Sequence, residues 1–567
     1  MGFRAPVSEY LFLLDHVLGY DRVAAQPRFA EAGRDTAAAV LEEAGRLASE
    51  VLAPLQRPGD LTPARLQDGQ VVTSPGFAGG YRAIAEGGWV GIAAGTEAGG
   101  MGLPVSLSMA VGEMMAGACL SLQLCPLLSQ GQIEALEHHG SEALKALYLP
   151  RLVSGEWTGT MCLTEPQAGS DVGALTTRAE PAGDGSHRIT GQKIYITWGD
   201  HDMAENICHL VLARLPDGGP GTKGISLFLV PKFLPDADGA PGAANAVTTV
   251  SLEHKLGLHG SPTAVLQFEA AQGWLVGAPH KGMAAMFTMM NNARLGVAMQ
   301  GVGIAEAALQ AAGAYAAERR QGETPEPGES AIQGHADLRR MLAEMQADTF
   351  AARAIALSCA VAIDMARATG DAAWAARAAL LTPVAKSFGT ETGMRVAETG
   401  VQVHGGMGVI EETGAAQFCR DVRVTAIYEG TNGIQAMDLA GRKLGDGGKA
   451  AFGLIDEIQD AAGSLRGRHP DLAGPVWDAA EGLREATERM LAAGLTDRFA
   501  VAAPYLRGFA RVLGGWHHLQ AGAAEEARLP LARFYIRRML PEAGPLLAQA
   551  GLGAADLYAV RPPGRTV

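Results

Sequence analysis

The chain has 567 residues, of which 48% are hydrophobic and 19% are charged. This length predicts three or four packed units, and the composition is typical of folded domains and excludes a largely disordered chain. The net charge of −14 and the pI near 5.5 argue against a nucleic-acid-binding protein, because such a protein needs clustered cations to displace the counterions of phosphates.

The cysteines, the first residues and the apolar stretches of the chain indicate its cellular compartment and whether it binds a metal. The six cysteines are far apart and form neither a C-x-x-C motif nor a zinc-ligand spacing, so we expect reduced thiols, a cytoplasmic protein and no bound metal. The first residues lack the apolar core of a secretory signal. We find no uncharged apolar stretch of about 18 residues, so we expect no membrane span.

Helical and β patterns alternate along the chain. Residues 1–35 are expected to form an N-terminal lead-in, and residues 36–158, rich in Ala, Leu and Glu at helical spacing, an N-terminal helical domain. Short alternating apolar runs divided by Gly, Pro and Asp predict a middle β domain at 159–278. Long Ala, Met and Leu segments predict a helical domain at 279–445 and an additional one at 446–567. The predicted fold class is therefore α+β.

Three runs contain glycines that could serve a cofactor. MCLTEPQAGSDVGAL at 161–175 has small residues around Ser170 that let a planar ligand approach the backbone, or that simply form a turn. HGGMGV at 404–409 is either a helix end with a turn or a set of free N–H groups for a cofactor phosphate. GVGIAE at 301–306 follows no predicted strand, so close helix packing is favoured there over a dinucleotide fingerprint.

The run KIYITWGDHD at 193–202 alternates as a strand. We therefore expect Tyr195 and Thr197 on one face and Ile196 and Trp198 on the other. Core packing explains this pattern as well as a ligand does.

The run IYEGTNGIQ at 427–435 places one carboxylate, Glu429, between an apolar dipeptide and a Gly-Thr-Asn turn. Apolar surroundings raise the pKa of a carboxylate toward the value that a general base needs near neutral pH. A glutamate that favours a helix start is the alternative interpretation.

Taken in order, the runs at 161–175, 193–202, 404–409 and 427–435 resemble the acyl-CoA dehydrogenase family, and TEAGGMGLP at 96–104 adds a fifth match. The resemblance covers roughly the span from residue 40 to residue 445. It implies a helical domain, a β-barrel-like middle domain and a C-terminal helical bundle, with FAD held across a subunit interface.

The implied reaction is α,β-dehydrogenation of an acyl-CoA thioester to the trans-2-enoyl-CoA. Glu429 would remove the α-proton, and flavin N5 would accept the β-hydride. Some members carry the base immediately before the arginine that matches Arg294, but Ala293 stands there in this chain. The resemblance therefore assigns the base to Glu429.

The resemblance also implies binding roles. The expected FAD contacts are Leu163, Thr164, Ser170, Tyr195, Ile196, Thr197, Arg319, Gln402, Gly405, Gly406 and Thr431. The expected substrate contacts are Ser170, Arg294, Tyr428 and Gly430. Within the first set, Arg319 and the segment 402–406 are expected to reach the FAD of a partner subunit. The chain departs from many relatives at Tyr195, Gly322 and Gly433, where they carry other residues.

Ordinary members end near the position of residue 445. The lead-in and the additional C-terminal domain, with the run ITGQKIYITWGDHDMAENICHLVLAR at 189–214, resemble the subgroup that includes 3-methylthiopropionyl-CoA dehydrogenases. The expected partners are an acyl-CoA, an electron-transfer flavoprotein and further copies of the chain, a dimer being favoured over a tetramer. We expect the additional domain to cap that dimer.

Three alternatives remain open at this point. The chain could be a medium- or long-chain acyl-CoA dehydrogenase, or an acyl-CoA oxidase in which oxygen reoxidises the flavin. It could also be an alkylation-response flavoprotein that binds DNA. The only support for DNA binding is the set of arginines Arg498, Arg507, Arg511, Arg528, Arg533, Arg537 and Arg538. Their interleaving with acidic residues favours a packed, solvated face.

Overall fold

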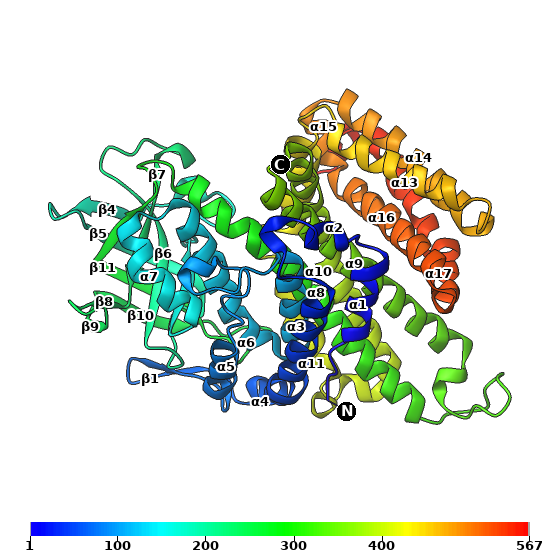
Figure 1. The fold of residues 1–567 in the computed structure, drawn as a ribbon, viewed down its shortest axis with the longest axis horizontal. Helices are drawn as coiled ribbons and strands as arrows, with labels where there is room; N and C mark the ends of the chain where they lie inside the picture. The colour runs from blue at the N-terminus through cyan, green and yellow to red at the C-terminus, as the bar shows by residue number, and fades with distance from the viewer. Residues whose placement is uncertain (1, 565–567) are drawn as a thin grey trace.

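The computed structural model describes residues 2–564 and places a β-rich domain at one end of a large helical body (Figure 1). The N-terminal part is helical, because its apolar residues recur at helical spacing. Its helices are α1 (Val7–His16), α2 (Asp21–Ala24), α3 (Arg34–Arg46), α4 (Gln56–Leu61), α5 (Phe77–Glu86), α6 (Val105–His139) and α7 (Glu142–Ser154). A small hairpin, β1 (Arg65–Gln67) and β2 (Gln70–Val72), interrupts them.

The middle part is a seven-stranded sheet. Its strands are β3 (Trp157–Cys162), β4 (Arg178–Pro181), β5 (His187–Thr197), β6 (Asn206–Arg214), β7 (Ile225–Pro231), β10 (Val247–Leu252) and β11 (Thr263–Val276). Strand β11 pairs with β5 on one side and with β7 on the other. Strand β5 pairs in turn with β4, and β7 pairs with β6. A single residue pair between β4 and β6 joins the two branches. These five strands therefore close into a ring, as the expected β-barrel-like domain requires. A hairpin of β8 (Phe233–Pro235) and β9 (Pro241–Ala244) lies beside it.

The ring encloses a hydrophobic core of its own, separate from the core of the helices. Its members include Ile189, Ile196, Phe228 and Phe268, all at most 2% exposed. Because side chains alternate along a strand, every second residue of these strands fills this interior.

The alternation expected at the end of β5 holds only in part. Ile196 points into the barrel interior, but Trp198 belongs to the helical core, where its Nε1 donates to the carbonyl of Ser121 at 3.1 Å. Tyr195 has a φ of 59° and Trp198 a φ of 53°, and the register with β11 shifts at this point. The prediction that Ile196 and Trp198 share a face is wrong, because a bulge and a turn interrupt the strand.

Three long helices form the bundle that follows: α8 (Gly282–Glu318), α9 (Ala336–Thr369) and α10 (Ala372–His404). Two short helices, α11 (Ala415–Val422) and α12 (Asn432–Asp438), complete it. The prediction that no apolar stretch reaches spanning length is wrong, because α6 and α9 are each long and apolar enough to cross a membrane. However, 94% and 83% of their most apolar windows are buried inside the protein. We interpret both as interior helices of the fold.

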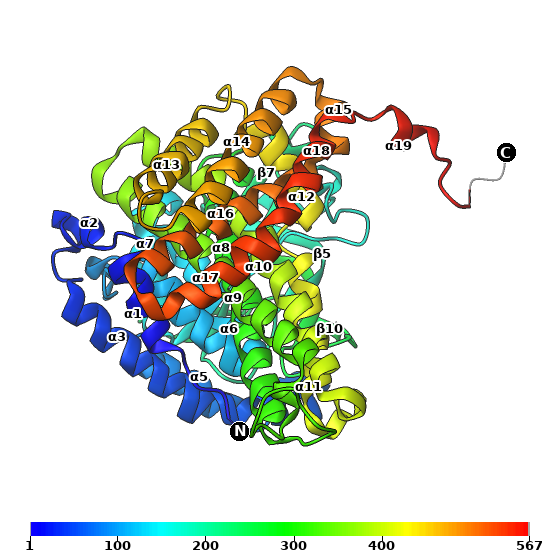
Figure 2. The ribbon, with the colours of Figure 1, turned by 90° about the vertical axis from the view of Figure 1, so that its right-hand side faces the viewer.

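The additional domain lies across α9 and α10 (Figure 2). Its helices are α13 (Lys449–Leu465), α14 (Pro470–Ala492), α15 (Leu495–Ala500), α16 (Ala502–Ala524), α17 (Leu529–Phe534), α18 (Ala543–Ala548) and α19 (Ala555–Ala559). Helix α19 projects away from the body in Figure 2. The lead-in meets this domain directly, because Arg528 donates to both carboxylate oxygens of Glu9 at 2.7 Å and lies over the ring of Phe12.

A buried arginine joins the additional domain to the bundle. Arg511 of α16 is only 2% exposed, forms an ion pair with Asp348 of α9 and donates to Glu542 at 2.7 Å. Its guanidinium also lies 5.4 Å from the ring of Phe388 on α10. This domain therefore packs on α9 and α10 through a buried charge as well as through apolar contacts.

Most of the C-terminal arginines that raised the question of DNA binding are engaged within the protein. Arg507 pairs with Glu542, Arg528 with Glu9, and Arg533 and Arg537 with Asp471. These ion pairs neutralise arginines that a nucleic-acid surface would leave free for phosphates.

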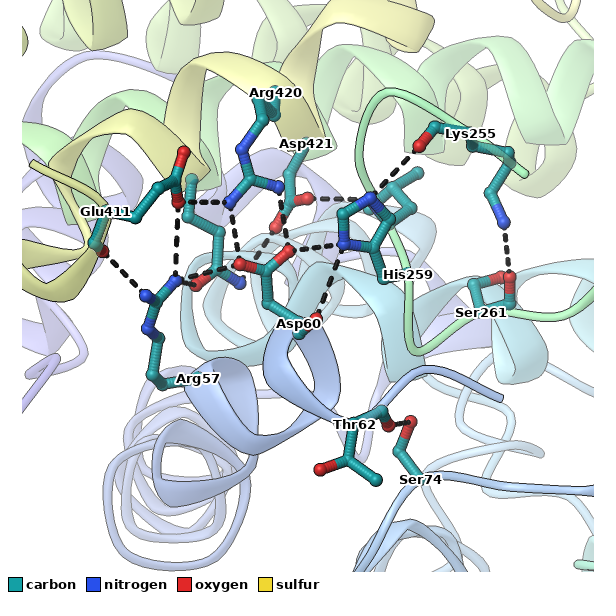
Figure 3. A network of polar contacts seen from close by, with 12 residues as sticks. Arg57, Asp60, Thr62, Ser74, Lys255, His259, Ser261, Glu411, Arg420 and Asp421 are labelled. Atoms are coloured by element: carbon teal, nitrogen blue, oxygen red, sulfur yellow. Dashed lines mark hydrogen bonds and ion pairs between the residues drawn. The ribbon is translucent and has the colours of Figure 1, made fainter. Parts of the chain in front are cut away.

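A polar network connects the N-terminal helices, the barrel and the bundle (Figure 3). Asp60 of α4 accepts two hydrogen bonds from Arg420 of α11, at 2.6 and 2.7 Å, and lies 2.8 Å from Nδ1 of His259. Asp421, whose pKa burial raises to about 6, accepts from the backbone N–H of Leu258 at 2.6 Å. Because His259 and Leu258 lie in the loop between β10 and β11, this network fixes the barrel against the bundle.

Candidate functional site

The expected base lies on the turn between the 3-10 helix at Arg423–Ala426 and α12. Glu429 has a φ of 55° and Gly430 a φ of 86°, so two consecutive residues are left-handed. For a residue other than glycine this conformation is strained and persists only where the surroundings enforce it. The turn ends at Thr431, whose hydroxyl accepts from the N–H of Ile434 at 3.2 Å and caps α12.

Two side chains hold this turn through its carbonyl groups. Arg294 of α8, which is 5% exposed, donates from Nε to the carbonyl of Glu429 at 3.3 Å. Gln435 of α12 donates to the carbonyls of both Glu429 and Gly430 at 3.3 Å. These bonds fix the backbone and leave the carboxylate of Glu429 free.

The carboxylate of Glu429 has a raised pKa and one oxygen without a partner. Its Oε2 is buried and has no hydrogen-bond partner among residues 2–564. Burial raises the pKa of Glu429 to about 7, and the nearby charges of Arg294 and Lys386 oppose this rise. A base whose pKa lies near the working pH is partly ionised and still strong enough to take a proton.

Sequence reasoning missed Lys386, which lies on α10 and is fully buried. Its Nζ donates to Oδ1 of Asn432 at 3.0 Å, and Asn432 in turn donates to the hydroxyl of Thr390 at 3.0 Å. Burial lowers the pKa of Lys386 to about 7, against the opposing charge of Glu429. The available signal was a single lysine in the otherwise uncharged segment 378–390, since a fully buried lysine is rare.

Tyr428, an expected substrate contact, starts a chain of buried polar groups. Its hydroxyl donates to Gln300 of α8, and Gln300 donates to Gln123 of α6 at 2.8 Å. Two residues before Gln123, the carbonyl of Ser121 accepts from Trp198 at the end of β5. The structure therefore links the turn of the expected base, through α8 and α6, to the strand expected against the flavin.

On the barrel side, a buried ion pair supports the segment that follows β3. Nζ of Lys193 lies 2.8 Å from Oε1 of Glu165, and both side chains are at most 2% exposed. Lys193 also donates to the carbonyl of Leu163 at 3.0 Å, while the carbonyl of Thr164 accepts from the N–H of Ile194 at 3.0 Å. Leu163 and Thr164 are thus held against β5, beside Tyr195.

Glu165 also closes the loop that carries Ser170. Its carboxylate accepts from the backbone N–H groups of Thr176 and Thr177 at 2.7 and 3.0 Å. Burial alone would raise the pKa of Glu165, but Lys193 and these donors hold it at about 2. Sequence reasoning missed this pair, whereas it named the exposed Ser170 that the pair positions.

The three residues at the end of β5 that were expected to contact FAD differ in their exposure to solvent. Tyr195 is 61% exposed and Thr197 is partly exposed, so both are accessible to a ligand. Ile196 is 2% exposed and packs in the barrel interior, which leaves only its backbone for a cofactor contact.

Four expected cofactor residues form a second group at the far ends of α8 and α10. Arg319 is the C-terminal cap of α8 and is exposed, and Gln402 lies in the last turn of α10, before residues 405–406. The ring of His404 stacks on that of Tyr315 at 4.5 Å, which brings the two helix ends together.

The structure does not place this second group beside Glu429 of the same chain. Arg294 contacts Glu429, and the 25 residues of helical rise from Arg294 to Arg319 span about 37 Å. The separation fits a role toward another subunit's cofactor, which stays a prediction.

Four family models match consecutive parts of the chain. The N-terminal, middle and C-terminal domains of acyl-CoA dehydrogenase match residues 34–156, 160–271 and 280–444. A model described as acetyl-CoA dehydrogenase C-terminal like matches residues 454–561. The chain belongs to the acyl-CoA dehydrogenase family.

Similar proteins support this assignment along most of the chain. The 3-methylmercaptopropionyl-CoA dehydrogenase of Ruegeria pomeroyi is 42% identical, over 93% of this chain and 92% of its own length. A broad-specificity linear acyl-CoA dehydrogenase of Mycobacterium tuberculosis is 36% identical, over 82% of this chain and 79% of its own. The crystal structure of Caenorhabditis elegans ACDH-11 in complex with C11-CoA shares the fold, with a TM-score of 0.79 at 21% identity, covering 94% of this chain and 91% of that chain.

This acyl-CoA dehydrogenase therefore oxidises the CH–CH bond of an acyl-CoA thioester with FAD as its cofactor. The residues present fit that cofactor. The exposed ring of Tyr195 offers an apolar plane, and the backbone at Gly405 and Gly406 is open, because a Cβ added at either would meet no atom within 4 Å. Oε2 of Glu429 is buried and has no hydrogen-bond partner in the described part of the chain.

Proposed function

We propose that Glu429 removes the α-proton of the acyl-CoA and that the preferred acyl group is the 3-methylmercaptopropionyl group. The observation that carries the first part is the half-buried side chain of Glu429, whose Oε2 is buried and unpartnered among residues 2–564. Its pKa is raised to about 7, and Arg294 and Gln435 hold its backbone. The second part rests on the similarity to the Ruegeria pomeroyi enzyme over nearly the whole chain.

In this proposal Glu429 removes the proton, and other side chains orient its carboxylate. Arg294 and Gln435 hold the turn so that the carboxylate of Glu429 faces the α-carbon. The backbone N–H of Glu429 is assigned to the thioester oxygen, where a donor of this kind stabilises the developing charge by about 3–4 kcal/mol. FAD, when bound, would supply the acceptor for the β-hydrogen, which leaves as a hydride while the carbon–carbon double bond forms.

The rate of flavin bleaching by a bound acyl-CoA should depend on pH through Glu429. The base must be ionised, and burial raises its pKa to about 7, so the rate should rise with pH and reach half its maximum near that value. Single-turnover stopped-flow measurements below and above this pKa will test the expectation. A rate that is constant or falls across this range would contradict the assignment.

A panel of thioesters tests the proposed acyl group. We expect 3-methylmercaptopropionyl-CoA to give a higher kcat/KM than butyryl-CoA, octanoyl-CoA or palmitoyl-CoA. Equal values along the series would instead favour a broad-specificity linear acyl-CoA dehydrogenase, of which one relative is 36% identical. Maximal activity with palmitoyl-CoA would indicate a long-chain enzyme.

We also propose that an electron-transfer flavoprotein reoxidises the FAD and that the chain acts as a dimer. The group of Arg319, Gln402 and residues 405–406 supports the dimer, because it lies too far from Glu429 to complete the same chain's site. Peroxide production without an added acceptor would instead identify an acyl-CoA oxidase.

A further inference from the structure

A cavity of about 550 Å³ lies where the catalytic bundle meets the additional C-terminal domain. This volume is in the usual range for a small-molecule site. It is lined by residues of α8, α12, the segment Leu439–Lys443 and α15. Three of these four segments belong to the bundle that carries Glu429, and the fourth, α15, belongs to the additional domain.

The bundle side of the cavity begins at the catalytic turn. Arg294, which donates to the carbonyl of Glu429, lines the cavity. Two guanidinium groups lie near the ring of Phe287, that of Arg294 at 5.9 Å and that of Arg442 at 5.7 Å from its centre. Arg294 therefore borders both the cavity and the backbone of the turn that carries Glu429.

The opposite wall comes from α15. The ring of Phe499 packs directly on Gly441, because a Cβ added there would lie 3.1 Å from the ring. Leu495, one turn earlier, is 57% exposed and also lines the cavity. Both side chains lie in the part of the chain that the fourth family model matches, residues 454–561.

The chemistry of the cavity suits a ligand that is both anionic and flat. Arg294 and Arg442 bring two positive charges, and Asp438, bonded to Arg442, brings the single negative charge of the lining. Phe287 and Phe499 add two aromatic rings, on which a nucleobase can stack. The CoA arm combines phosphates, which arginines bind well, with an adenine ring.

We propose that the additional C-terminal domain completes the acyl-CoA site, with Phe499 and Leu495 forming the outer wall of a subsite for the CoA arm. The inference rests on the proposed function for the position of the thioester at Glu429. It assigns to this domain a contribution to substrate affinity in addition to its packing role.

The first test changes the charge at Leu495, whose exposure lets either variant fold. Leu495→Asp places a carboxylate beside the CoA phosphates, and Leu495→Lys places an ammonium there. We expect the Asp variant to bind free CoA at least about 3-fold more weakly than the Lys variant at low salt, with the difference reduced at high salt. Equilibrium dialysis of the FAD-loaded protein against CoA measures this directly. Equal affinities, or weaker binding by the Lys variant, would overturn the proposal.

The second test removes the aromatic wall. Phe499→Ala should raise the KM for the best acyl-CoA about 10-fold, and should raise it less for the matching N-acetylcysteamine thioester, which lacks the nucleotide. Phe534→Ala, on α17 of the same domain and outside the cavity, is the matched control and should leave both values unchanged. Equal effects of Phe499→Ala on the two thioesters, or equal effects of the two variants, would refute the subsite.

These outcomes separate the subsite from the proposed function. If no acyl-CoA bleaches the wild-type flavin, the proposed function fails, whatever the variants do. If the wild type is active but the Leu495 pair binds CoA equally, only the subsite fails.

Discussion

Replacing Glu429 with Gln is expected to slow substrate-dependent flavin bleaching by about 10²- to 10⁴-fold, the usual contribution of a general base. Gln keeps the size and the backbone of the turn, which Arg294 and Gln435 hold through carbonyl groups, but it cannot accept the α-proton. The variant should therefore stay folded and retain its yellow FAD. Stopped-flow mixing with an acyl-CoA under anaerobic conditions measures the rate.

The control for this experiment is Glu142→Gln, the same change at a side chain that is 91% exposed on the N-terminal helices. It should bleach at the wild-type rate. Full and rapid reduction of the flavin in Glu429→Gln would show that another group takes the proton. Lys386 would then be the first residue to examine, since burial lowers its pKa to about 7 beside the same turn.

Replacing Lys193 with Met should destabilise the protein by about 3–5 kcal/mol and weaken its hold on FAD, because it leaves Glu165 as a buried, unpaired charge. The structural change should be confined to the edge of the barrel, where Leu163, Thr164 and the loop of Ser170 lie. Denaturant unfolding gives the free energy of unfolding, and the flavin absorbance that remains after gel filtration reports FAD retention.

The matched control is Lys145→Met, which breaks a solvent-exposed pair with Glu142. Exposed pairs contribute little, so this variant should be nearly as stable as the wild type and keep its FAD. A loss of stability for Lys193→Met no larger than that for Lys145→Met would show that the ion pair of Lys193 with Glu165 does not support the site.

The sequence predicts those features of the site that depend on residues close together in the chain. The order of helical and β segments follows from local periodicity, and the turn around Glu429 carries its carboxylate, its glycine and its capping threonine within three residues. A base on a left-handed turn is in that sense a local feature. The resemblance then supplied the chemistry that the local pattern left open.

The sequence did not predict the roles of Lys193, Glu165 and Lys386, because these roles depend on residues that are distant in the chain. Lys193 and Glu165 are 28 positions apart and become a pair only when β5 lies beside the segment after β3. Lys386 is 43 residues before Glu429, and only the packing of α10 brings it to the turn. The bulge at Tyr195 likewise depends on the register with β11, which the sequence of β5 alone does not contain.

The buried contact of Arg511 with Asp348 has a consequence for how the molecule unfolds. Asp348 lies on α9, deep in the catalytic bundle, yet one of its two cationic partners belongs to the additional domain. Cutting the chain near residue 445 would leave this aspartate with Arg395 alone and would expose the apolar surfaces of α9 and α10 to water. We therefore expect residues 446–567 to unfold together with the bundle that carries Glu429, and a shortened version to need new side chains on α9 and α10 before it could stand alone.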